Sequence, residues 1–376
     1  MKKITYYLLL AATMLLFMGC NKKSGYDGDV ISEYQKNYDA NNPSVTQAPE
    51  TDAEVTATAV ATPIQEDPNH ENDMISWLNG QWVSKEIGTK RPIAFQFNNF
   101  KSVSNQWGIS QADIVYECIV EGGITRLLGI GENYQGDRIG STRSARHYFV
   151  SIADEYDAIY IHYGGTKYAR AKVKELGVDE IDGNSNMDSI VFFRDHSIKA
   201  PHNAFATQKG MLKGIEVKKF KTEYSEEDQA HFSFYQEDTA LTSDKNAEKI
   251  VLDFSAYTSP YFTYNSTDKL YYRYQFGGAH KDSNTGKQLT FKNVIIQFVK
   301  EWNIDKKGYQ TMDLKNAAGK GIYITNGKMV PITWKKNEAK HFMRYYDETG
   351  AELTINPGKT YIALFPNDRT GDVKIN

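Results

Sequence analysis

The sequence contains very few cysteines and no excess of positive charge. Only two cysteines, Cys20 and Cys118, occur in 376 residues. If Cys20 is modified, as the N-terminal sequence predicts, the remaining thiol cannot form a disulfide within the mature chain. The 44 Lys and Arg against 47 Asp and Glu give a formal net charge of -3, which offers no electrostatic basis for binding nucleic acid.

Apolar and aromatic residues are present in the amounts that a folded protein needs. Hydrophobic residues make up 40% of the chain, and aromatic residues 13%, with 25 Tyr and 18 Phe. This composition permits a sizeable core and favours sheets over a coiled coil or a disordered chain. The length allows about two or three domains.

The N-terminal residues 1–19 have the layout of an export signal. Lys2 and Lys3 precede the apolar run YYLLLAATMLLFMG, which is too short to be a comfortable membrane span. The run ends in LFMGC, which resembles the lipobox of bacterial lipoproteins, although Phe17 stands where that motif prefers Leu. We therefore predict that Cys20 is lipidated and anchors an extracytoplasmic protein to the membrane. The alternative is an ordinary signal peptide that is cleaved near the same place.

Residues 20–75 are predicted to be a flexible linker. They are rich in Asn, Asp, Thr, Ser, Ala and Pro and contain few large apolar side chains, so they cannot bury enough surface to fold. A coil of this length has an r.m.s. reach on the order of 40 Å, enough to hold a domain clear of a bilayer. A pro-segment or a peptide ligand for a partner is an alternative.

Residues 76–224 are predicted to form an α/β domain with a mostly parallel sheet, because strand and helix patterns alternate along them. Strands are expected at 91–99, 124–132, 158–161 and 189–195. Helices are expected at 110–121 after the N-cap candidate Ser110, after the Gly-Ser-Thr turn at Gly140, at 166–177, and at 203–214.

The rest of the chain is predicted to be an acidic connection, 225–244, followed by a β-rich (α+β) C-terminal domain, 245–376. The dipeptide Asn326-Gly327 between two apolar runs is a strong hairpin signal. Pro331 should lie at a strand edge, because it has no N–H to donate. The run from Tyr261 to Gly278 could present a ring surface for a glycan, but core packing with one wet face is the more usual arrangement for such a pattern.

Polar residues collect after predicted strands and at a predicted helix start, where α/β folds place their ligands. Guanidinium groups facing a helix N-terminus favour a phosphate or carboxylate. The predicted ligand-binding residues are Arg143, Arg146, Arg194, Ser141, Ser144 and Asn203. The alternative is that the arginines simply pair with carboxylates such as Asp137 and Glu155.

A catalytic role is the secondary hypothesis for this region. His162 or His202 could act as a general base, with Ser141 or Ser144 as nucleophile and Asp195 as orienting carboxylate. However, GSTRSA does not fit the G-x-S-x-G elbow, so an enzyme is not the favoured interpretation. No metal or cofactor is expected, because His162, Asp195, His196 and His202 lack the spacing of a metal motif.

Other polar residues in this half have simpler explanations. His202 or Asn203 could cap the helix that is expected to follow Pro201, and a histidine at a strand end usually bonds a backbone carbonyl. Cys118 lies among apolar residues with no base beside it, which predicts a buried structural thiol.

Two blocks of sequence are familiar. QADIVYECIVEGGITRLLGI, RIGSTRSARHYF, IYIHYGG, FFRD and KAPHN in the first half, with ITWKKN and RYYDETGAELTINPGKTYIALFP in the second, resemble the YerB-like family of bacterial lipoproteins. This resemblance spans nearly everything after Arg91. It implies a lipid-anchored extracytoplasmic protein with paired domains of unknown function, and it supplies neither a reaction nor catalytic residues.

These observations lead to three hypotheses. The first is a lipid-anchored protein whose α/β domain binds an anionic envelope component, such as a wall carboxylate or phosphate, or a wall-synthesis partner. The second is a hydrolase or transferase that acts on envelope polymers. The third is a scaffold that binds envelope proteins through its β-rich domain.

Overall fold

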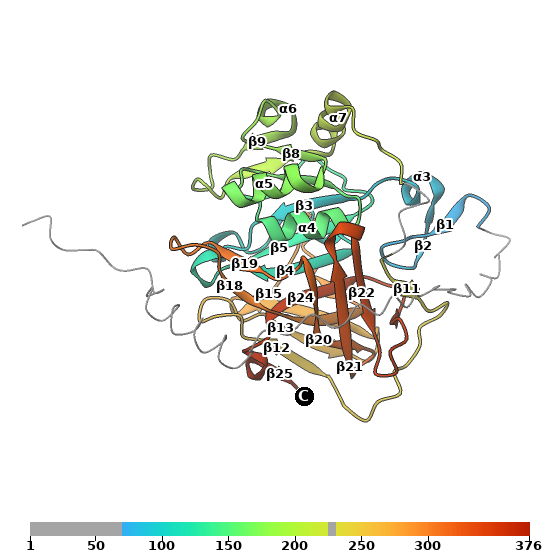
Figure 1. Ribbon diagram of the computed structural model, residues 1–376. Helices are drawn as coiled ribbons and strands as arrows, with labels where there is room; N and C mark the ends of the chain where they lie inside the picture. The colour runs from blue at the N-terminus through green and yellow to red at the C-terminus, as the bar shows by residue number, and fades with distance from the viewer. Residues whose placement is uncertain (1–69, 225–230) are drawn as a thin grey trace, which may run out of the picture. The chain divides into compact units, whose positions relative to one another are not determined.

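A ten-stranded sheet runs through both halves of the chain (Figure 1). The computed structural model describes residues 70–224 and 231–376, so the predicted signal peptide, Cys20 and nearly all of the predicted linker lie outside the described residues. In spatial order the strands are β22 (Phe342–Tyr346), β21 (Lys328–Asn337), β20 (Asn316–Thr325), β17 (Asn293–Val299), β24 (Thr360–Pro366), β4 (Ile114–Ile119), β5 (Thr125–Gly131), β3 (Ile93–Phe97), β7 (Ile159–His162) and β8 (Glu180–Asp182).

This sheet is mixed, which corrects the prediction of a mostly parallel sheet. The pairs β17·β24, β24·β4, β3·β7 and β7·β8 are parallel, whereas the other five neighbouring pairs are antiparallel. Three of the antiparallel pairs, β4·β5, β20·β21 and β21·β22, are formed by strands that follow each other in the chain. The short turn η3 (Glu121–Gly123) connects β4 to β5 through glycines with φ of 76° and 70°.

The segment predicted as a helix around Cys118 is the central strand β4. All six of its residues are buried, because β4 lies between β24 and β5 and is covered on both faces. A strand buried on both faces is continuously apolar and can be mistaken for a buried helix. The short helix η2 (Ile109–Gln111) contains Ser110, the predicted N-cap.

Strand pairing and a buried ion pair both join the two halves of the chain. β24, from the C-terminal half, pairs in parallel with β4 from Thr360 opposite Ile114 onward. Beside this pairing, Glu117 Oε2 lies 2.5 Å from Arg273 Nη2, and both side chains are almost completely buried. Tyr361 also donates its hydroxyl proton to Glu117 Oε2 at 2.6 Å. The halves therefore share one core rather than meeting only at a linker.

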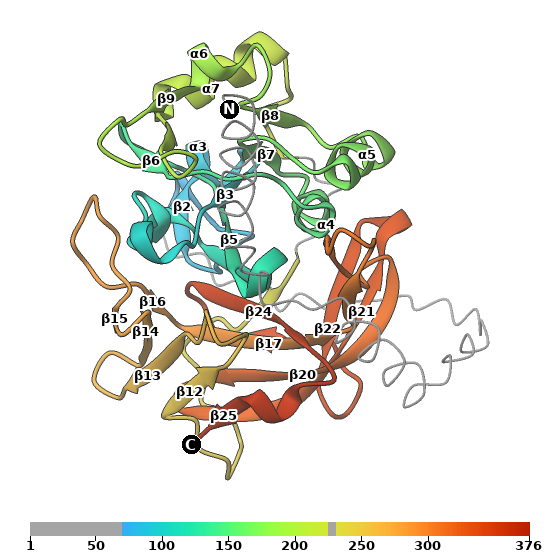
Figure 2. The same cartoon turned by 90° about the vertical axis from the view of Figure 1, so that its left-hand side faces the viewer.

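Two longer helices lie side by side on one side of β3, β5 and β7 (Figure 2). These are α4 (His147–Glu155) and α5 (Lys167–Leu176). α5 confirms the predicted helix at 166–177: the Thr166 hydroxyl accepts from the backbone N–H of Ala169 at 3.1 Å, and Gly177 ends the helix with φ of 72°. The side-chain cap and the left-handed glycine are the local signals that mark such helix ends.

The segment after Pro201 forms a strand before it forms a helix. β10 (Ala204–Ala206) pairs with β9 (Phe192–Arg194) and with β6 (Ile139–Gly140). The helix α7 (Gln208–Lys218) is capped by the Thr207 hydroxyl, so the expectation that His202 or Asn203 caps it was wrong. The predicted strand at 189–195 also begins as a helical turn, α6 (Asp188–Val191). The remaining short helices are α3 (Lys85–Gly88), η1 (Lys101–Val103), η4 (Glu338–Lys340) and η5 (Thr370–Asp372).

A second sheet covers part of the C-terminal half. It contains β12 (Lys249–Leu252), β13 (Tyr261–Asn265), β14 (Leu270–Gln275), β15 (Gly278–Ala279), β16 (Thr290–Phe291) and β25 (Val373–Ile375). Phe262 and Tyr271 are buried on its inner face. On the partly exposed face, the rings of Tyr261 and Tyr274 stack with their centroids 4.6 Å apart. The aromatic run thus has the expected core side and wet side.

The hairpin signal at Asn326-Gly327 is confirmed. These residues have φ of 52° and 73° and form the turn between β20 and β21. Pro331 pairs with Ile322 on β20, while β22 joins β21 only from Thr333 onward. Pro331 therefore lies where β21 has no neighbour among the described residues on its other side, which agrees with the predicted edge position.

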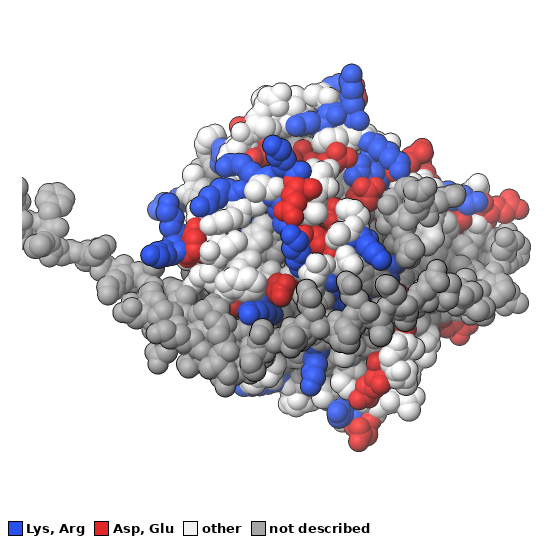
Figure 3. All heavy atoms as spheres, viewed as in Figure 1, with Lys and Arg blue, Asp and Glu red and all other residues white. Residues whose placement is uncertain are grey.

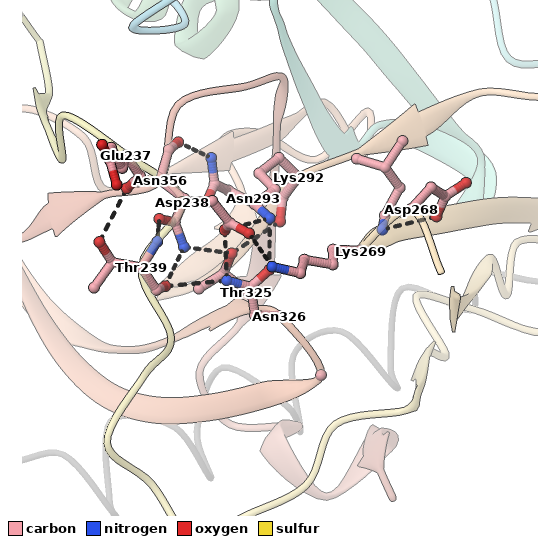
Figure 4. A network of polar contacts seen from close by, with 12 residues as sticks. Glu237, Asp238, Thr239, Asp268, Lys269, Lys292, Asn293, Thr325, Asn326 and Asn356 are labelled. Atoms are coloured by element: carbon pink, nitrogen blue, oxygen red, sulfur yellow. Dashed lines mark hydrogen bonds and ion pairs between the residues drawn. The ribbon is translucent and has the colours of Figure 1, made fainter. Parts of the chain in front are cut away.

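The predicted acidic connection is held to this hairpin by a network of charges (Figure 4). Asp238 is 2.7 Å from Lys269 Nζ and 2.6 Å from Lys292 Nζ, and it accepts from the Asn326 amide at 2.7 Å. Burial alone would raise the pKa of Asp238, but the two lysines and the amide hold that pKa well below its usual range. Two cations surround one acid, so the network fixes the connection in place.

Three two-stranded sheets complete the described part of the fold. They are formed by β1 (Asp73–Ile75) with β2 (Trp82–Ser84), by β11 (Ser233–Phe234) with β23 (Thr354–Ile355), and by β18 (Glu301–Asn303) with β19 (Gln310–Met312). Within 70–224 and 231–376, no helix combines the length and apolar character needed to cross a bilayer.

Candidate functional site

The arginine-rich segment from Ser141 to Arg146 crosses the carboxyl ends of two parallel strands, β3 and β7. Its backbone bonds to both strand ends: Arg143 N donates to Gln96 O at 3.1 Å, and Arg143 O accepts from Tyr163 N at 3.1 Å. Further along, Ala145 N donates to Gly164 O at 2.8 Å. This edge is where α/β sheets usually bind ligands. The sequence prediction placed these residues at strand ends, and the structure brings them together there.

Arg126 is a member of this cluster that the sequence analysis missed. It lies near the start of β5, and β5 runs antiparallel to β3, so its first residues reach the same sheet edge. The side chain is 7% exposed, and its Nη1 donates to Ser144 O. Burial, followed by the positive charges of Arg146 and Arg143, lowers the pKa of Arg126 to about 9. The available signal was a charged residue inside the otherwise apolar strand pattern ITRLLGIGE.

Arg146 is neutralised by Glu121, in the turn between β4 and β5. Its Nε lies 2.9 Å from both carboxylate oxygens, and its Nη2 contacts Oε2 as well. Burial opposes ionisation, but this pairing lowers the pKa of Glu121 below its ordinary value. The partner is neither of the carboxylates suggested from the sequence, since Glu155 pairs with Lys336 at 2.7 Å. One of the predicted ligand-binding arginines is thus held in a structural ion pair.

Arg143 has no such partner. Its side chain is half-buried, and its Nη1 donates to Pro201 O at 3.0 Å. Across 70–224 and 231–376, neither Arg143 nor Arg126 has a carboxylate within ion-pair distance. Burial, with the charge of Arg146, lowers the pKa of Arg143. Two guanidiniums therefore share this edge without a counter-charge of their own.

His202 lies beside these arginines and is oriented by two neighbours. Its ring stacks on Phe100 with centroids 4.4 Å apart, and its Nδ1 is 3.3 Å from Asn98 Nδ2. Burial, followed by the charges of Arg143 and Arg126, lowers the pKa of His202. The imidazole is therefore neutral at neutral pH. With Nδ1 accepting from the Asn98 amide, the proton lies on Nε2.

Arg194 and Asn203 form a neighbouring pair. Arg194 Nη1 donates to Asn203 Oδ1 at 2.8 Å, and its guanidinium lies 4.5 Å from the centroid of the Tyr163 ring. Arg194 is exposed, whereas Asn203 is buried. Arg194 is therefore held at the rim of the cluster by its contact with Tyr163, which follows the end of β7.

The proposed catalytic residues are mostly engaged in other contacts. His162 is 2% exposed, and its ring nitrogens lie 2.9 Å from Gly164 O and 2.9 Å from Glu180 Oε2. Asp195 pairs with Arg138 at 2.5 Å rather than with a histidine. The hydrogen bonds from Ser197 and Arg138 lower the pKa of Asp195 to about 2. His162 therefore makes the carbonyl bond expected of a histidine at a strand end.

The two serines contribute mainly through packing and backbone atoms. Ser141 is 1% exposed, and its hydroxyl lies 3.3 Å from Asn98 Nδ2. Ser144 supplies the carbonyl that accepts from Arg126 and, at 3.3 Å, from Arg146 Nη1. Neither serine caps α4: the N-cap is Arg146, and no side chain hydrogen-bonds there. The Gly-Ser-Thr turn thus positions arginines instead of opening the helix.

The cluster formed by Arg126, Arg143, Arg146, Glu121 and His202 is called here the arginine site. The arginine site contains three cations and a single carboxylate, and His202 adds a neutral N–H donor. This set of donors suits a phosphate or carboxylate. In the described part of the chain, no group of three or more His, Cys, Asp or Glu residues could hold a metal ion.

Comparison with known proteins gives a consistent result for both halves. Residues 78–221 match the family described as "Protein of unknown function (DUF3048) N-terminal domain", and residues 250–362 match its "C-terminal domain". The chain is 28% identical over 291 residues to a protein of Bacillus subtilis (strain 168) named "Putative lipoprotein YerB", covering 77% of this chain and 86% of that protein. It is also similar to the crystal structure of the YerB protein from Bacillus subtilis, with a TM-score of 0.70 and 26% identity. That similarity covers 81% of this chain and 99% of that one.

Proposed function

The chain belongs to the YerB-like family, and from this premise we propose that it is a lipid-anchored extracytoplasmic protein that binds an anionic component of the bacterial cell envelope at the arginine site. The anchor is the lipid on Cys20. The bound group is a carboxylate or phosphate, held by Arg126 and Arg143 and by the Nε2 proton of His202. The name of the Bacillus subtilis relative supports the anchor.

One observation carries the proposal: Arg126 and Arg143 converge at a sheet edge without a carboxylate of their own. Most buried charges in proteins are paired, because desolvating a lone cation is costly. Here the only carboxylate of the cluster, Glu121, is bound on both oxygens by Arg146. A bound anion would supply the missing counter-charge through charge-assisted hydrogen bonds.

The contacts of His202 favour binding over catalysis. A general base needs an unprotonated nitrogen that faces the substrate, but the free nitrogen of His202 carries the proton, because Asn98 occupies Nδ1. In addition, Asp195 is paired with Arg138, so it does not orient this imidazole. An N–H donor beside two guanidiniums suits recognition of an oxyanion.

Binding can be tested with the chain from residue 20 onward carrying Cys20→Ala, so that no lipid is attached. Titration calorimetry with inorganic phosphate and with purified wall fragments should show saturable binding. Arg143→Gln should weaken it by roughly 10- to 100-fold, since a hydrogen bond to a charged group contributes about 1.5 to 3 kcal/mol. Arg138→Gln is the matched control, because Arg138 lies just before the Ser141–Arg146 segment but has its own carboxylate, Asp195. Equal binding by the Arg143 and Arg138 variants would refute the arginine site.

The same incubation distinguishes a binding protein from an enzyme. If the wall fragments keep their masses while they bind, the binding proposal stands. If new products form and His202→Gln abolishes them, an enzyme that acts on envelope polymers replaces it. Retention of envelope proteins by a chain with intact β-rich residues 245–376 but with Arg143→Gln would favour the scaffold hypothesis instead.

Lipid anchoring is tested separately in cells. The full chain should incorporate radiolabelled palmitate and fractionate with membranes, and Cys20→Ala should abolish the label and release the protein. Cys118→Ala is the control, because Cys118 is buried. Unchanged labelling of the Cys20 variant would exclude the proposed anchor without affecting the arginine site.

A further inference from the structure

The helix α5 and the β18–β19 hairpin contact each other and form one continuous surface. Both elements are far from Cys20 in the sequence. The Tyr168 hydroxyl donates to Asp305 Oδ2 at 2.7 Å, and Lys167 Nζ lies 3.8 Å from the same oxygen. The rings of Tyr168 and Tyr309 also meet edge to face, with centroids 5.9 Å apart. These contacts hold the turn of the hairpin beside the first turn of α5.

Exposed cations gather on this surface. Lys167, Arg170 and Lys174 are exposed and lie three and four positions apart, so they follow one stripe of α5. The hairpin turn adds the exposed Lys306 and Lys307. Figure 3 shows Lys and Arg side chains gathered over α5 and over the tip of this hairpin. We call these five residues the basic face.

The cations of the basic face are poorly compensated. Lys167 shares Asp305, which also accepts from Tyr168. The other four have no carboxylate within ion-pair distance in 70–224 or 231–376. Glu175, at the end of α5, is occupied by Lys172 at 3.0 Å and by Lys315 at 3.6 Å. The surface therefore presents uncancelled positive charge.

The hairpin turn also exposes an apolar side chain next to its lysines. Ile304, at the hairpin turn, is 37% exposed, which makes it one of the few large apolar residues of the described chain that reach solvent. Trp302 on β18 is partly exposed, and Lys300 Nζ lies 5.6 Å from its ring centroid. Apolar and aromatic side chains flanked by lysines are typical of surfaces that enter the interface of a bilayer.

We propose that the basic face binds the anionic headgroups of a lipid bilayer, with Ile304 entering the interfacial region. Lysines alone would be enough to bind a soluble polyanion, so a polyanion does not explain the exposed Ile304 beside them. A bilayer explains both features, because its headgroup layer is charged and the layer beneath is apolar. Each basic residue near an anionic membrane strengthens the electrostatic attraction. The basic face therefore acts as a second membrane contact in addition to the lipid.

The same hairpin also contacts the arginine site. On the same hairpin, Gln310 N donates to Glu121 Oε1 at 3.4 Å, and the Thr311 hydroxyl lies 2.5 Å from His147 Nε2. Glu121 is the partner of Arg146. Docking of the hairpin tip on a bilayer would thus fix the orientation of the arginine site relative to the membrane surface.

Vesicle sedimentation tests the proposal with the chain from residue 20 onward carrying Cys20→Ala, which retains every residue that the structure describes. It should bind vesicles of equal parts phosphatidylglycerol and phosphatidylcholine, and not vesicles of phosphatidylcholine alone. Lys306→Glu/Lys307→Glu should lower the partition coefficient by on the order of tenfold or more. Ile304→Ser should lower it about threefold or more without changing the net charge.

The control has the same change of charge at a distant place. Lys218→Glu/Lys219→Glu alters two adjacent exposed lysines at the end of α7, which Figure 1 shows well away from the β18–β19 hairpin. An equal loss of binding in this control would reduce the effect to net charge and overturn the proposal. It is also overturned if Ile304→Ser binds like the parent while soluble polyphosphate competes fully, because the surface would then recognise an anionic polymer.

Discussion

Arg146 Nε lies 2.9 Å from each carboxylate oxygen of Glu121, so a single arginine occupies the one carboxylate of a site that contains three arginines. This relationship decides the chemistry of the site. It removes Arg146 from the set of groups that can take a ligand, and it leaves Arg126 and Arg143 as cations without counter-charge.

Replacing Arg126 should stabilise the protein while it abolishes binding. Arg126→Met removes a buried cation that has no carboxylate partner, and Arg146 still donates to the carbonyl of Ser144. We expect the free energy of unfolding in urea to rise by about 1 to 4 kcal/mol, with loss of phosphate binding.

Arg91→Met is the matched comparison for Arg126→Met. Arg91 is equally buried but is paired with Asp157 at 2.9 Å and with Asp179 at 2.6 Å. Removing it breaks both ion pairs, whose acids are partly exposed, so we expect a loss of about 1.5 to 3 kcal/mol. If Arg126→Met destabilises the protein by a similar amount, Arg126 has a structural rather than a ligand-binding role.

Glu301 should make the protein less stable as pH rises toward neutrality. Burial raises the pKa of Glu301 to about 7, and its Oε2 has no hydrogen-bond partner among the residues that the structure describes. Because the folded pKa lies above the unfolded value, the stabilising contribution is complete below about pH 4.5 and is lost as pH rises through 7. The expected difference is about 3 kcal/mol.

The measurement is urea unfolding of Glu301→Gln and of the parent at pH 5 and pH 8. The variant should lose less stability than the parent between these two values. Glu348→Gln, at an exposed turn, should behave like the parent. Parallel pH profiles for the parent and Glu301→Gln would contradict this prediction.

The ion pair between Glu117 and Arg273 should make the two halves fold together. Both side chains are almost fully buried, and they come from opposite halves of the chain. Arg273→Met leaves Glu117 as a buried charge without its cation and should cost about 3 to 5 kcal/mol. The N-terminal half alone, residues 70–224, should fail to give a cooperative thermal transition in circular dichroism, because it also loses the pairing of β4 with β24. A sharp transition of that half alone would show that it folds without the C-terminal strands.

Cys118 should be unreactive in the native protein. Burial raises the pKa of its thiol, and the negative charges of Glu117 and Glu301 add to the effect. The thiolate is the reactive form, so a chromogenic disulfide reagent should modify Cys118 only after denaturant is added. In the chain that carries Cys20→Ala, rapid modification of the native protein would place Cys118 at an accessible site.

Local sequence signals were sufficient for several elements. Thr166 and Gly177 mark the two ends of α5, and Asn326-Gly327 forms the turn between β20 and β21. Both signals can be seen in the sequence because capping and left-handed backbone geometry depend on neighbouring residues alone. Burial of Cys118 was also foreseen from its apolar neighbours, although it lies on a strand instead of a helix. The blocks that resemble the YerB-like family were sufficient to identify the family.

The pairing of distant strands was decided only by the tertiary structure. β4 has the apolar pattern of a buried helix, and it becomes a strand because β24, from the far end of the chain, pairs with it. As a strand, β4 also pairs antiparallel with β5, which adds to the mixed character of the sheet. Arg126 and Glu121 belong to the arginine site because β4 ends and β5 begins at the edge that the Ser141–Arg146 segment crosses. The sequence alone thus determined where charges would follow strands. The tertiary structure determined which of those charges meet, because side chains far apart in sequence become neighbours only through the order of the strands in the sheet.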